Sequence, residues 1–251
     1  TDLSTRVMTT ETSCLWARVS GVWENQSGHG EDPAARMSGV GTRLGGQWQV
    51  APSWFVGGSF GYGRAWANAA DFSSHGDLYD GSLSVRHTHN AWTFAGSLSI
   101  GSGQFENSRA FQLAPVGTLA GTSSSYTSNT AALLIGGRLR AAYQIPLRTF
   151  YLRPYADLDL LRTQMPGFQE SGSEGLPLAF RASQTTALSL SPMLEFGGER
   201  QLDANTRLRP YLAMGLSLRS GFNWAMQAQI QGAEPGDGHF RLFGNTPAVV
   251  G

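Results

Sequence analysis

The sequence has no long apolar run, no lysine and almost no cysteine. No stretch approaches the roughly 18 apolar residues that a transmembrane helix needs, so any membrane span must consist of strands closed into a barrel. Cys14 is the single cysteine in 251 residues, which excludes an internal disulfide and a cysteine-based metal centre. All 18 basic residues are arginines and 18 acidic residues balance them. This neutral charge leaves no basic footprint for nucleic acid, which we exclude as a partner.

The first residues also lack a recognisable export signal. A secretory protein begins with a charged segment followed by an apolar run, and Thr1 to Ser13 has neither. We therefore expect this chain to be the mature part of a longer protein, or its export signal to lie elsewhere.

What the sequence does contain is strict alternation, most clearly from Thr206 to Arg219. Every second residue from Leu208 to Leu218 is apolar, while the alternate positions from Arg207 to Arg219 include three arginines and several small residues. A period of two predicts a strand. At about 3.3 Å per residue and a tilt of about 40°, this strand would project to about 25 Å, the height of an outer-membrane apolar band. The apolar face is predicted to meet lipid, and the arginine face water.

The same alternation recurs along the chain and predicts an antiparallel meander. The other predicted strands begin near Leu15, Arg36, Trp54, Leu78, Ala91, Leu133, Leu152 and Leu188, and a tenth begins at Thr246. Polar segments between them are predicted to be long loops, namely Ala65–His75, Gly101–Asn129, Met165–Gly175 and Phe222–Gly244. The connections at the opposite end are short. The fold class is therefore all-β, a transmembrane antiparallel up-and-down β-barrel.

A soluble β-sandwich or propeller is the alternative, with the apolar faces forming a core. Two features favour the barrel: runs of 12 or more alternating residues, where globular strands have about five or six, and short turns at one end with long loops at the other.

The barrel hypothesis predicts which residues lie on each face of the strands. An aromatic girdle is predicted at Trp23, Trp48, Trp54 and Trp92. Lipid-facing positions are Leu44, Phe60, Leu98, Leu139, Leu158, Leu194, Leu212 and Leu216. Lumen-facing positions are Arg18, Arg43, Asp80, Arg86, Arg138, Arg140, Arg153, Asp157, Asp159, Glu195, Arg207 and Arg209.

Several segments carry a resemblance to a known family. They are W-A-R-V-S-G early, D-G-S-L-S-V before a W-x-F-x-G strand, Y-L-R-P-Y-A-D-L-D-L followed by G-F-Q-E-S-G, and L-R-P-Y-L-A-M-G-L. In this order they resemble the C-terminal translocator β-domain of bacterial autotransporters, the type V secretion family. The most specific piece is P-x-x-x-L followed by G-F-x-E-x-G, between Pro154 and Gly172.

The resemblance implies a function and a domain organisation. It implies a twelve-stranded barrel in the outer membrane of a Gram-negative bacterium, threaded by a short helix that leads to a surface passenger. The implied partners are outer-membrane lipid, the protein's own passenger and linker helix, and the outer-membrane assembly machinery. Residues 1–13 would end the linker, and 14–251 would form the translocator domain. No terminal aromatic residue follows Gly251, so we expect about nine to ten strands in this chain and two or three closing strands to be missing.

No enzyme, metal site or cofactor is predicted. His87 and His89 share one strand face, as a metal site would need, but no third ligand accompanies them. No lipase, omptin-like protease or barrel phospholipase pattern is visible. Asp80, Asp157, Asp159 or Glu195 could activate an Asn of the linker for self-cleavage, which stays open, although charge pairing with arginines is the simpler role. A passive porin-like pore is the alternative function.

Overall fold

A computed structural model provides the structure. It describes residues 13–27, 34–113, 122–147, 150–172, 176–198, 200–201, 207–208, 210–220, 222–234, 237–246 and 249–250. The predicted linker, residues 1–13, lies outside these ranges except for Ser13, which is the first residue of strand β1. Every regular element in the described part of the chain is a strand. The predicted all-β class is confirmed.

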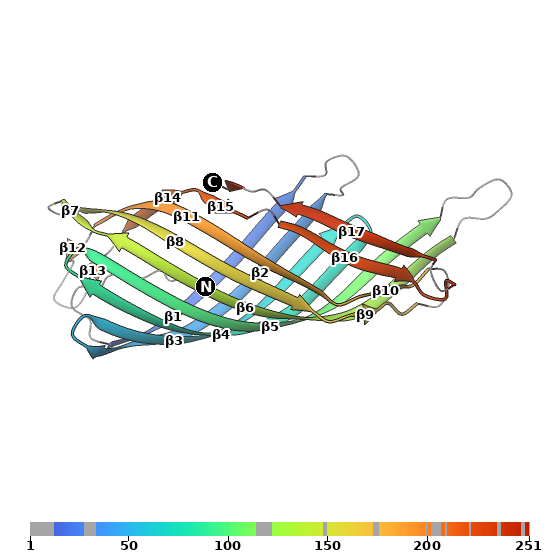
Figure 1. Cartoon of the computed structure of the whole chain (residues 1–251), viewed down its shortest axis with the longest axis horizontal. Helices are drawn as coiled ribbons and strands as arrows, with labels where there is room; N and C mark the ends of the chain where they lie inside the picture. The colour runs from blue at the N-terminus through green and yellow to red at the C-terminus, as the bar shows by residue number, and fades with distance from the viewer. Residues whose placement is uncertain are drawn as a thin grey trace.

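One large antiparallel sheet contains most of these strands (Figure 1). Its neighbours follow the chain in the order β1-β2-β3-β4-β5-β6-β8-β11-β15-β18, while β14 pairs with β11 and β7 pairs with β8. The bounds are β1 Ser13–Gln26, β2 Ala35–Ala51, β3 Trp54–Ala69, β4 Phe72–His89, β5 Trp92–Leu113, β6 Thr122–Tyr143, β7 Ile145–Leu147, β8 Phe150–Met165, β11 Ser183–Gly198, β14 Tyr211–Gly215, β15 Ser217–Arg219 and β18 Val249–Val250.

The register of this sheet keeps the two faces of the wall distinct. Pairing from β3 to β6 runs without a shift, and an irregularity at Gln49/Ala51 accompanies the β2–β3 turn. Ser53 and Asn90 sit in two-residue turns with φ of 66° and 53°, where a left-handed residue lets the strand reverse tightly. Because register is preserved, residues of one parity stay on one face from strand to strand.

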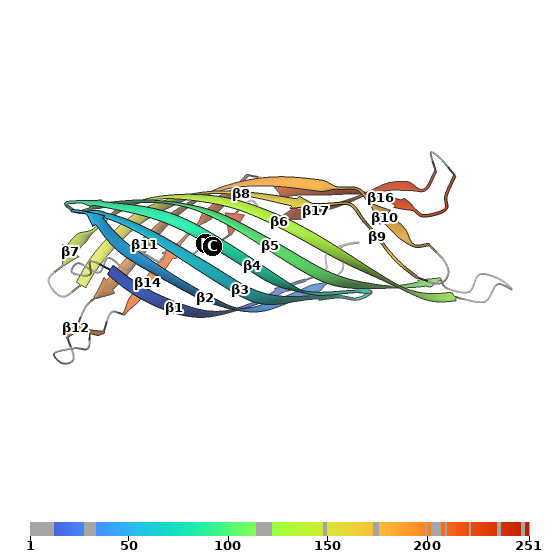
Figure 2. The same ribbon diagram turned by 90° about the horizontal axis from the view of Figure 1, so that it is seen from below.

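The sheet is curled into a half-barrel, which Figures 1 and 2 show from two directions. Such curling follows from strand twist and from the tilt that a barrel wall requires. It gives the wall a concave inner face and a convex outer face. Within the described residues, β1 pairs with β2 alone.

Two of the three predicted loops that are wrong are strand extensions, which run far beyond the apolar band. β3 continues to Ala69 and β4 begins at Phe72, so Ala65–His75 is a paired hairpin around a two-residue turn. β5 continues to Leu113 and β6 begins at Thr122, which replaces most of the predicted loop Gly101–Asn129 by a two-stranded ladder. Backbone hydrogen bonds sustain these extensions, whereas polar side chains on both faces erase the alternation that marks a half-apolar strand.

A second, four-stranded sheet lies at the same end and is here named the flap. It consists of β9 (Phe168–Gln169), β10 (Leu178–Phe180), β16 (Phe222–Ile230) and β17 (His239–Thr246), in the order β17-β16-β10-β9. The prediction of a loop over Phe222–Gly244 is therefore wrong, since this segment is a hairpin. The predicted breaker E-P-G-D-G belongs to the segment between β16 and β17, and its last residue, Gly238, has φ of 71°.

The stretch with the clearest alternation, Thr206–Arg219, is less continuous than predicted. Pro210 has no N–H to donate and separates β14 from β13 (Arg207–Leu208), which pairs with β12 (Arg200–Gln201) in its own small ladder. Thr206 and Arg209 lie outside the described residues. The predicted tenth strand corresponds to β18, which pairs with β15.

In the described part of the chain, no helix is long and apolar enough to cross a bilayer.

Candidate functional site

The inner face of the curled sheet is lined by charged side chains in adjacent rungs. Register places Arg18 beside Arg43, Arg138 beside Asp159, and Arg140 beside Asp157. Burial agrees with a crowded concave side, because Arg86, Arg153 and Asp157 are each only 5 to 6% exposed. Ten of the twelve predicted lumen-facing side chains lie on this face, and they are Arg18, Arg43, Asp80, Arg86, Arg138, Arg140, Arg153, Asp157, Asp159 and Glu195. The side chains of Arg207 and Arg209 lie outside the described part of the structure.

Arginine–carboxylate pairs connect these rungs and compensate four of the six arginines named above. Arg140 donates two hydrogen bonds to Asp157, from Nε to Oδ1 and from Nη2 to Oδ2, both at 2.6 Å. Arg138 donates through Nε to Asp159, and its Nη1 lies 3.9 Å from Asp157 Oδ2. Such two-point pairs are rigid as well as charge-compensated. The result is a polar ladder fixed in position across β6 and β8.

A second ion pair spans a glycine on the strand that lies between its two partners. Arg43 Nη2 lies 2.6 Å from Asp80 Oδ2, although Gly61 on β3 stands between their strands. A Cβ at Gly61 would come within 2.5 Å of Asp80 Oδ1 and 3.3 Å of Arg43 Nη2. Glycine therefore leaves open the gap through which the two charges meet, and a larger residue would displace the ends of both side chains.

A third pair lies near the short-turn end of the inner face. Arg153 Nη1 is 3.4 Å from Glu195 Oε1, which also accepts a hydrogen bond of 2.6 Å from Tyr151 Oη. Each acid considered for self-cleavage, namely Asp80, Asp157, Asp159 and Glu195, thus faces an arginine. Arg86 lies instead against Phe55, with its guanidinium carbon 4.3 Å from the ring centre.

The outer face carries the predicted apolar residues, and their side chains are strongly exposed. Exposed fractions are 64% for Leu44, 58% for Phe60, 73% for Leu98, 62% for Leu139, 40% for Leu158, 41% for Leu194, 62% for Leu212 and 52% for Leu216. On one strand the band from Trp54 to Tyr62 covers about 26 Å of chain, or about 20 Å when tilted by about 40°. A band of exposed leucines of this height fits a bilayer and no aqueous surface.

Aromatic side chains border this band. Trp48, Trp54 and Trp92 lie on the outer face near the short turns, while Trp23, 76% exposed, lies toward the other end of its strand. His87 and His89 are on the same outer face, where the His87 ring stacks on Trp54 at 4.3 Å. Among the described residues, no cluster of three or more His, Cys, Asp or Glu side chains is placed to hold a metal ion.

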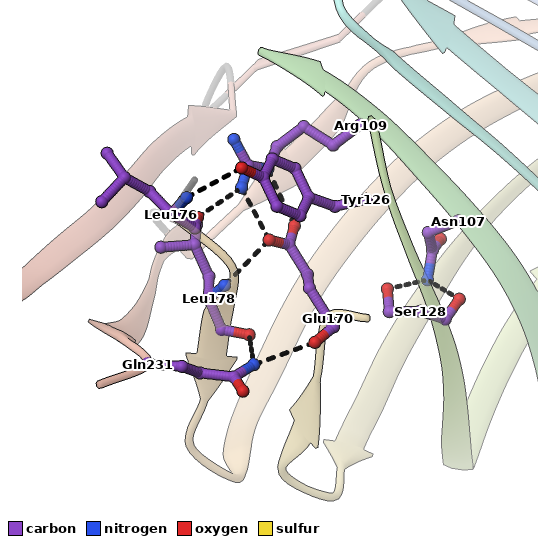
Figure 3. Close-up of polar contacts among 8 residues, drawn as sticks. All are labelled: Asn107, Arg109, Tyr126, Ser128, Glu170, Leu176, Leu178 and Gln231. Atoms are coloured by element: carbon purple, nitrogen blue, oxygen red, sulfur yellow. Dashed lines mark hydrogen bonds and ion pairs between the residues drawn. The ribbon is translucent and has the colours of Figure 1, made fainter. Parts of the chain in front are cut away.

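At the end with the longer connections, a buried carboxylate fastens the flap to the inner face (Figure 3). Arg109 on β5 donates to Glu170 through Nε at 2.8 Å and through Nη2 at 2.6 Å. The Glu170 side chain is 5% exposed and also accepts the Leu178 N–H at 2.9 Å. Gln231 adds hydrogen bonds to the carbonyls of Glu170 and Leu178 at 2.9 and 3.0 Å. We name this set of contacts the mouth lock.

Tyr126 on β6 completes the mouth lock. The Arg109 guanidinium stacks over its ring at 4.6 Å, and its hydroxyl accepts the Leu176 N–H at 2.8 Å. A Cβ on Gly172 would lie 2.5 Å from the ring, so only glycine lets this chain pass so close. Hydrogen bonding to Glu170 raises the pKa of Arg109. Because an arginine guanidinium stays charged at every accessible pH, we expect alkaline conditions to leave the mouth lock intact.

Sequence reasoning missed the mouth lock. Glu170 is the acid of the G-F-Q-E-S-G segment, yet its partner Arg109 is 61 positions away, inside a segment read as a loop. One sequence feature pointed to this contact: Glu170 lies between Gly167 and Gly172, and glycines on both sides of an acid indicate a tightly turned backbone in a fixed conformation.

A curled antiparallel sheet with a polar, charge-paired inner face and an exposed apolar outer face defines the class of outer-membrane β-barrel walls. The comparisons with known proteins identify the family within that class. Residues 15–248 match the autotransporter beta-domain family. The chain therefore belongs to that family, and its function is that of an outer-membrane translocator barrel.

Solved structures support the same fold. The translocator domain of the autotransporter NalP from Neisseria meningitidis is 14% identical, with a TM-score of 0.59, over 88% of this chain and 77% of that one. The beta domain of the Bordetella autotransporter BrkA is 18% identical, with a TM-score of 0.55, over 95% of this chain and 94% of that one. A search of curated proteins returned no match. Nothing in these comparisons supports the alternative of a passive pore.

Proposed function

We propose that this chain resides in the outer membrane of a Gram-negative bacterium, where it anchors an N-terminal passenger and carries it to the cell surface. The proposal rests mainly on the difference in burial and polarity between neighbouring residues of the sheet. Asp157 on the inner face is 5% exposed and doubly bonded to Arg140, whereas the adjacent Leu158 on the outer face is 40% exposed. Such a wall is stable when water fills its inside and lipid covers its outside.

The short turns are assigned to the periplasmic side, and the flap and strand extensions to the cell surface, in keeping with the usual arrangement of bacterial barrels. The tryptophans then mark the two membrane interfaces, with Trp48, Trp54 and Trp92 at the inner one and Trp23 toward the outer one. In this orientation the mouth lock lies where an exported chain would leave the lumen.

The inner face is proposed to surround the linker of the passenger. Its four arginine–carboxylate pairs compensate most of the charged groups on the wall, so that a polypeptide of varied sequence can pass without being trapped by one sign of charge. The translocator domain is not itself catalytic, and we assign no catalytic residue. Folding in the membrane is proposed to depend on the outer-membrane assembly machinery of the host.

Surface display tests this function. A reporter domain fused before Thr1 should become sensitive to protease added to intact cells, while a periplasmic marker in the same cells stays protected. A reporter that remains protected, although the barrel migrates as a folded, heat-modifiable band in outer-membrane fractions, would show that the chain is a membrane barrel without translocator activity.

A further inference from the structure

The flap continues the barrel wall, so one of its faces looks outward. A backbone bridge joins Ser171, just after β9, to Thr127 on β6, and each N–H donates to the carbonyl of the other, at 2.8 and 2.9 Å. Figure 2 shows β9, β10 and β16 extending from this part of the wall. Because Glu170 and Leu178 share the inner face with Arg109, the alternate residues of the flap strands point outward.

The outward face of the flap contains a hollow between two arginines. Arg181 directly follows β10, and its N–H donates to the Gln227 carbonyl of β16 at 3.0 Å. Gln227 in turn pairs with Arg241 on β17, and His239 lies two positions away on the same face. The hollow has a volume of about 370 Å³ and is lined by Arg181, Gln227, Ala228, His239, Phe240 and Arg241. We name it the basic hollow.

The arginines of the basic hollow have no acidic partner among the described residues. Arg181 Nη1 makes one long hydrogen bond, of 3.5 Å, to Gln227 Oε1, and no described carboxylate forms an ion pair with Arg181 or Arg241. Glu170 faces inward and is bound to Arg109, and the other described acids of the flap lie between β16 and β17. Two guanidinium groups without carboxylates beside one hollow form a site for an oxyanion such as a phosphate.

An outward arginine elsewhere on the barrel does have an acid beside it. Arg64 lies just beyond the apolar band of β3, and its register partner on β4 is Asp77, which accepts a hydrogen bond of 2.7 Å from Tyr62 Oη. Arg162 likewise lies just beyond the apolar band of β8, but its partner there is the neutral Gln184, whose Oε1 is 2.7 Å away. Positive charge without a neighbouring acid is therefore concentrated on the outward side of β8 and the flap.

The basic hollow lies beyond the apolar band on this same outward side. Strand β11 begins at Ser183, two positions after Arg181, and its first strongly exposed leucine is Leu188, at 45%. At about 3.3 Å per residue and a tilt of about 40°, Arg181 is roughly 18 Å above that leucine. In the orientation proposed above, this is the cell-surface side of the membrane. A lipid whose acyl chains cover the leucines would present its headgroup to the arginines.

We propose that the basic hollow binds phosphate groups of lipopolysaccharide, the glycolipid of the outer leaflet, an inference that rests on the membrane location and orientation given under the proposed function. This lipid carries phosphates on several of its sugars, above its acyl chains, on the side where Arg162 and the basic hollow lie. Guanidinium groups bind phosphate oxygens through paired hydrogen bonds, and basic pockets beside the apolar band of a membrane protein bind anionic headgroups. The flap is then fastened to the wall on its inner face and to lipid headgroups on its outer face.

A binding measurement on the full-length protein, purified in detergent, tests this site. The probe is a fluorescently labelled rough lipopolysaccharide with phosphates on its lipid A and inner core, and the reference is the same glycolipid dephosphorylated with hydrofluoric acid. The double variant R181Q/R241Q should bind the phosphorylated probe about tenfold more weakly, and the reference as the unaltered protein does. The matched control is R64Q, because Arg64 also faces outward but lies beside Asp77. Its affinity should remain within about twofold of the unaltered protein.

Equal binding of both glycolipids, unchanged affinity in the double variant, or the same loss in R64Q would overturn the proposal. Displacement of the probe by inorganic phosphate at concentrations as low as those of unlabelled glycolipid would also overturn it, since the site would then hold a free anion. If the double variant fails to fold, R241Q alone decides, with an expected loss of about threefold. A displayed reporter without phosphate-dependent binding overturns the lipid site alone, whereas phosphate-dependent binding without display overturns only the passenger transport.

Discussion

At single positions, the effect of a substitution depends on which face of the wall the residue occupies. Leu212 and Ala213 are neighbours on β14, at the same depth in the sheet. Leu212 pairs with Phe196 on the outer face and is 62% exposed, whereas Ala213 pairs with Glu195 on the inner face. An added positive charge meets lipid at the first position and a carboxylate at the second.

Leu212→Arg should therefore lower the fraction of barrel that folds in the outer membrane, since arginine on a lipid face costs about 2 to 4 kcal/mol at the bilayer midplane and less toward the interfaces. Ala213→Arg should leave that fraction unchanged, because water and Glu195 surround the new charge. Heat-modifiable migration of membrane fractions measures the folded fraction. Equal loss in both variants would refute the assignment of the two faces.

At the scale of elements, the mouth lock connects three segments that are remote in sequence: β5, the loop after β8, and the β16–β17 hairpin through Gln231. Removing one partner of a buried ion pair leaves the other charge without compensation, and this typically costs about 3 to 5 kcal/mol. The flap should then separate from the wall while the membrane-embedded strands stay paired.

Glu170→Ala should accelerate amide hydrogen exchange in β10 and β16 by roughly 100-fold or more, with little change in β3 to β6. Glu106→Ala is the matched control, because its carboxylate also lies beside a basic side chain, His75 Nε2 at 3.3 Å, but the Glu106 side chain is 74% exposed. Unchanged exchange in the flap of Glu170→Ala would mean that backbone pairing, rather than this ion pair, holds the flap.

How far the sequence predicts this structure also differs from element to element. Where one face meets lipid, as from Trp92 to Ile100, alternation was sufficient to predict strand, face and partner strand. Beyond the band both faces are polar, so the extension of β5 to Leu113 has no periodic signal and was predicted as a loop. The Arg109–Glu170 contact depends on that extension and on the bend of the flap, neither of which local sequence encodes.

At the scale of the whole molecule, the curled sheet is a wall with a charge-paired inner side and an apolar outer side. The exposed leucines and the bordering tryptophans anchor the outer side, and the charge pairs line the inner side. The fold alone is shared with other translocator domains at 14 to 18% identity, so the fold tolerates extensive change of sequence as long as the two faces keep their character.

The most direct test asks which face an exported polypeptide touches. Ser99 and Leu98 are adjacent on β5, the first on the inner face and the second on the outer face with 73% exposure. A photo-cross-linking amino acid is placed at one position or the other, in cells where export of a passenger is arrested midway. The account predicts cross-links to the passenger from position 99 and none from position 98. Passenger cross-links from position 98, or from both positions equally, would contradict transport along the inner face of this wall.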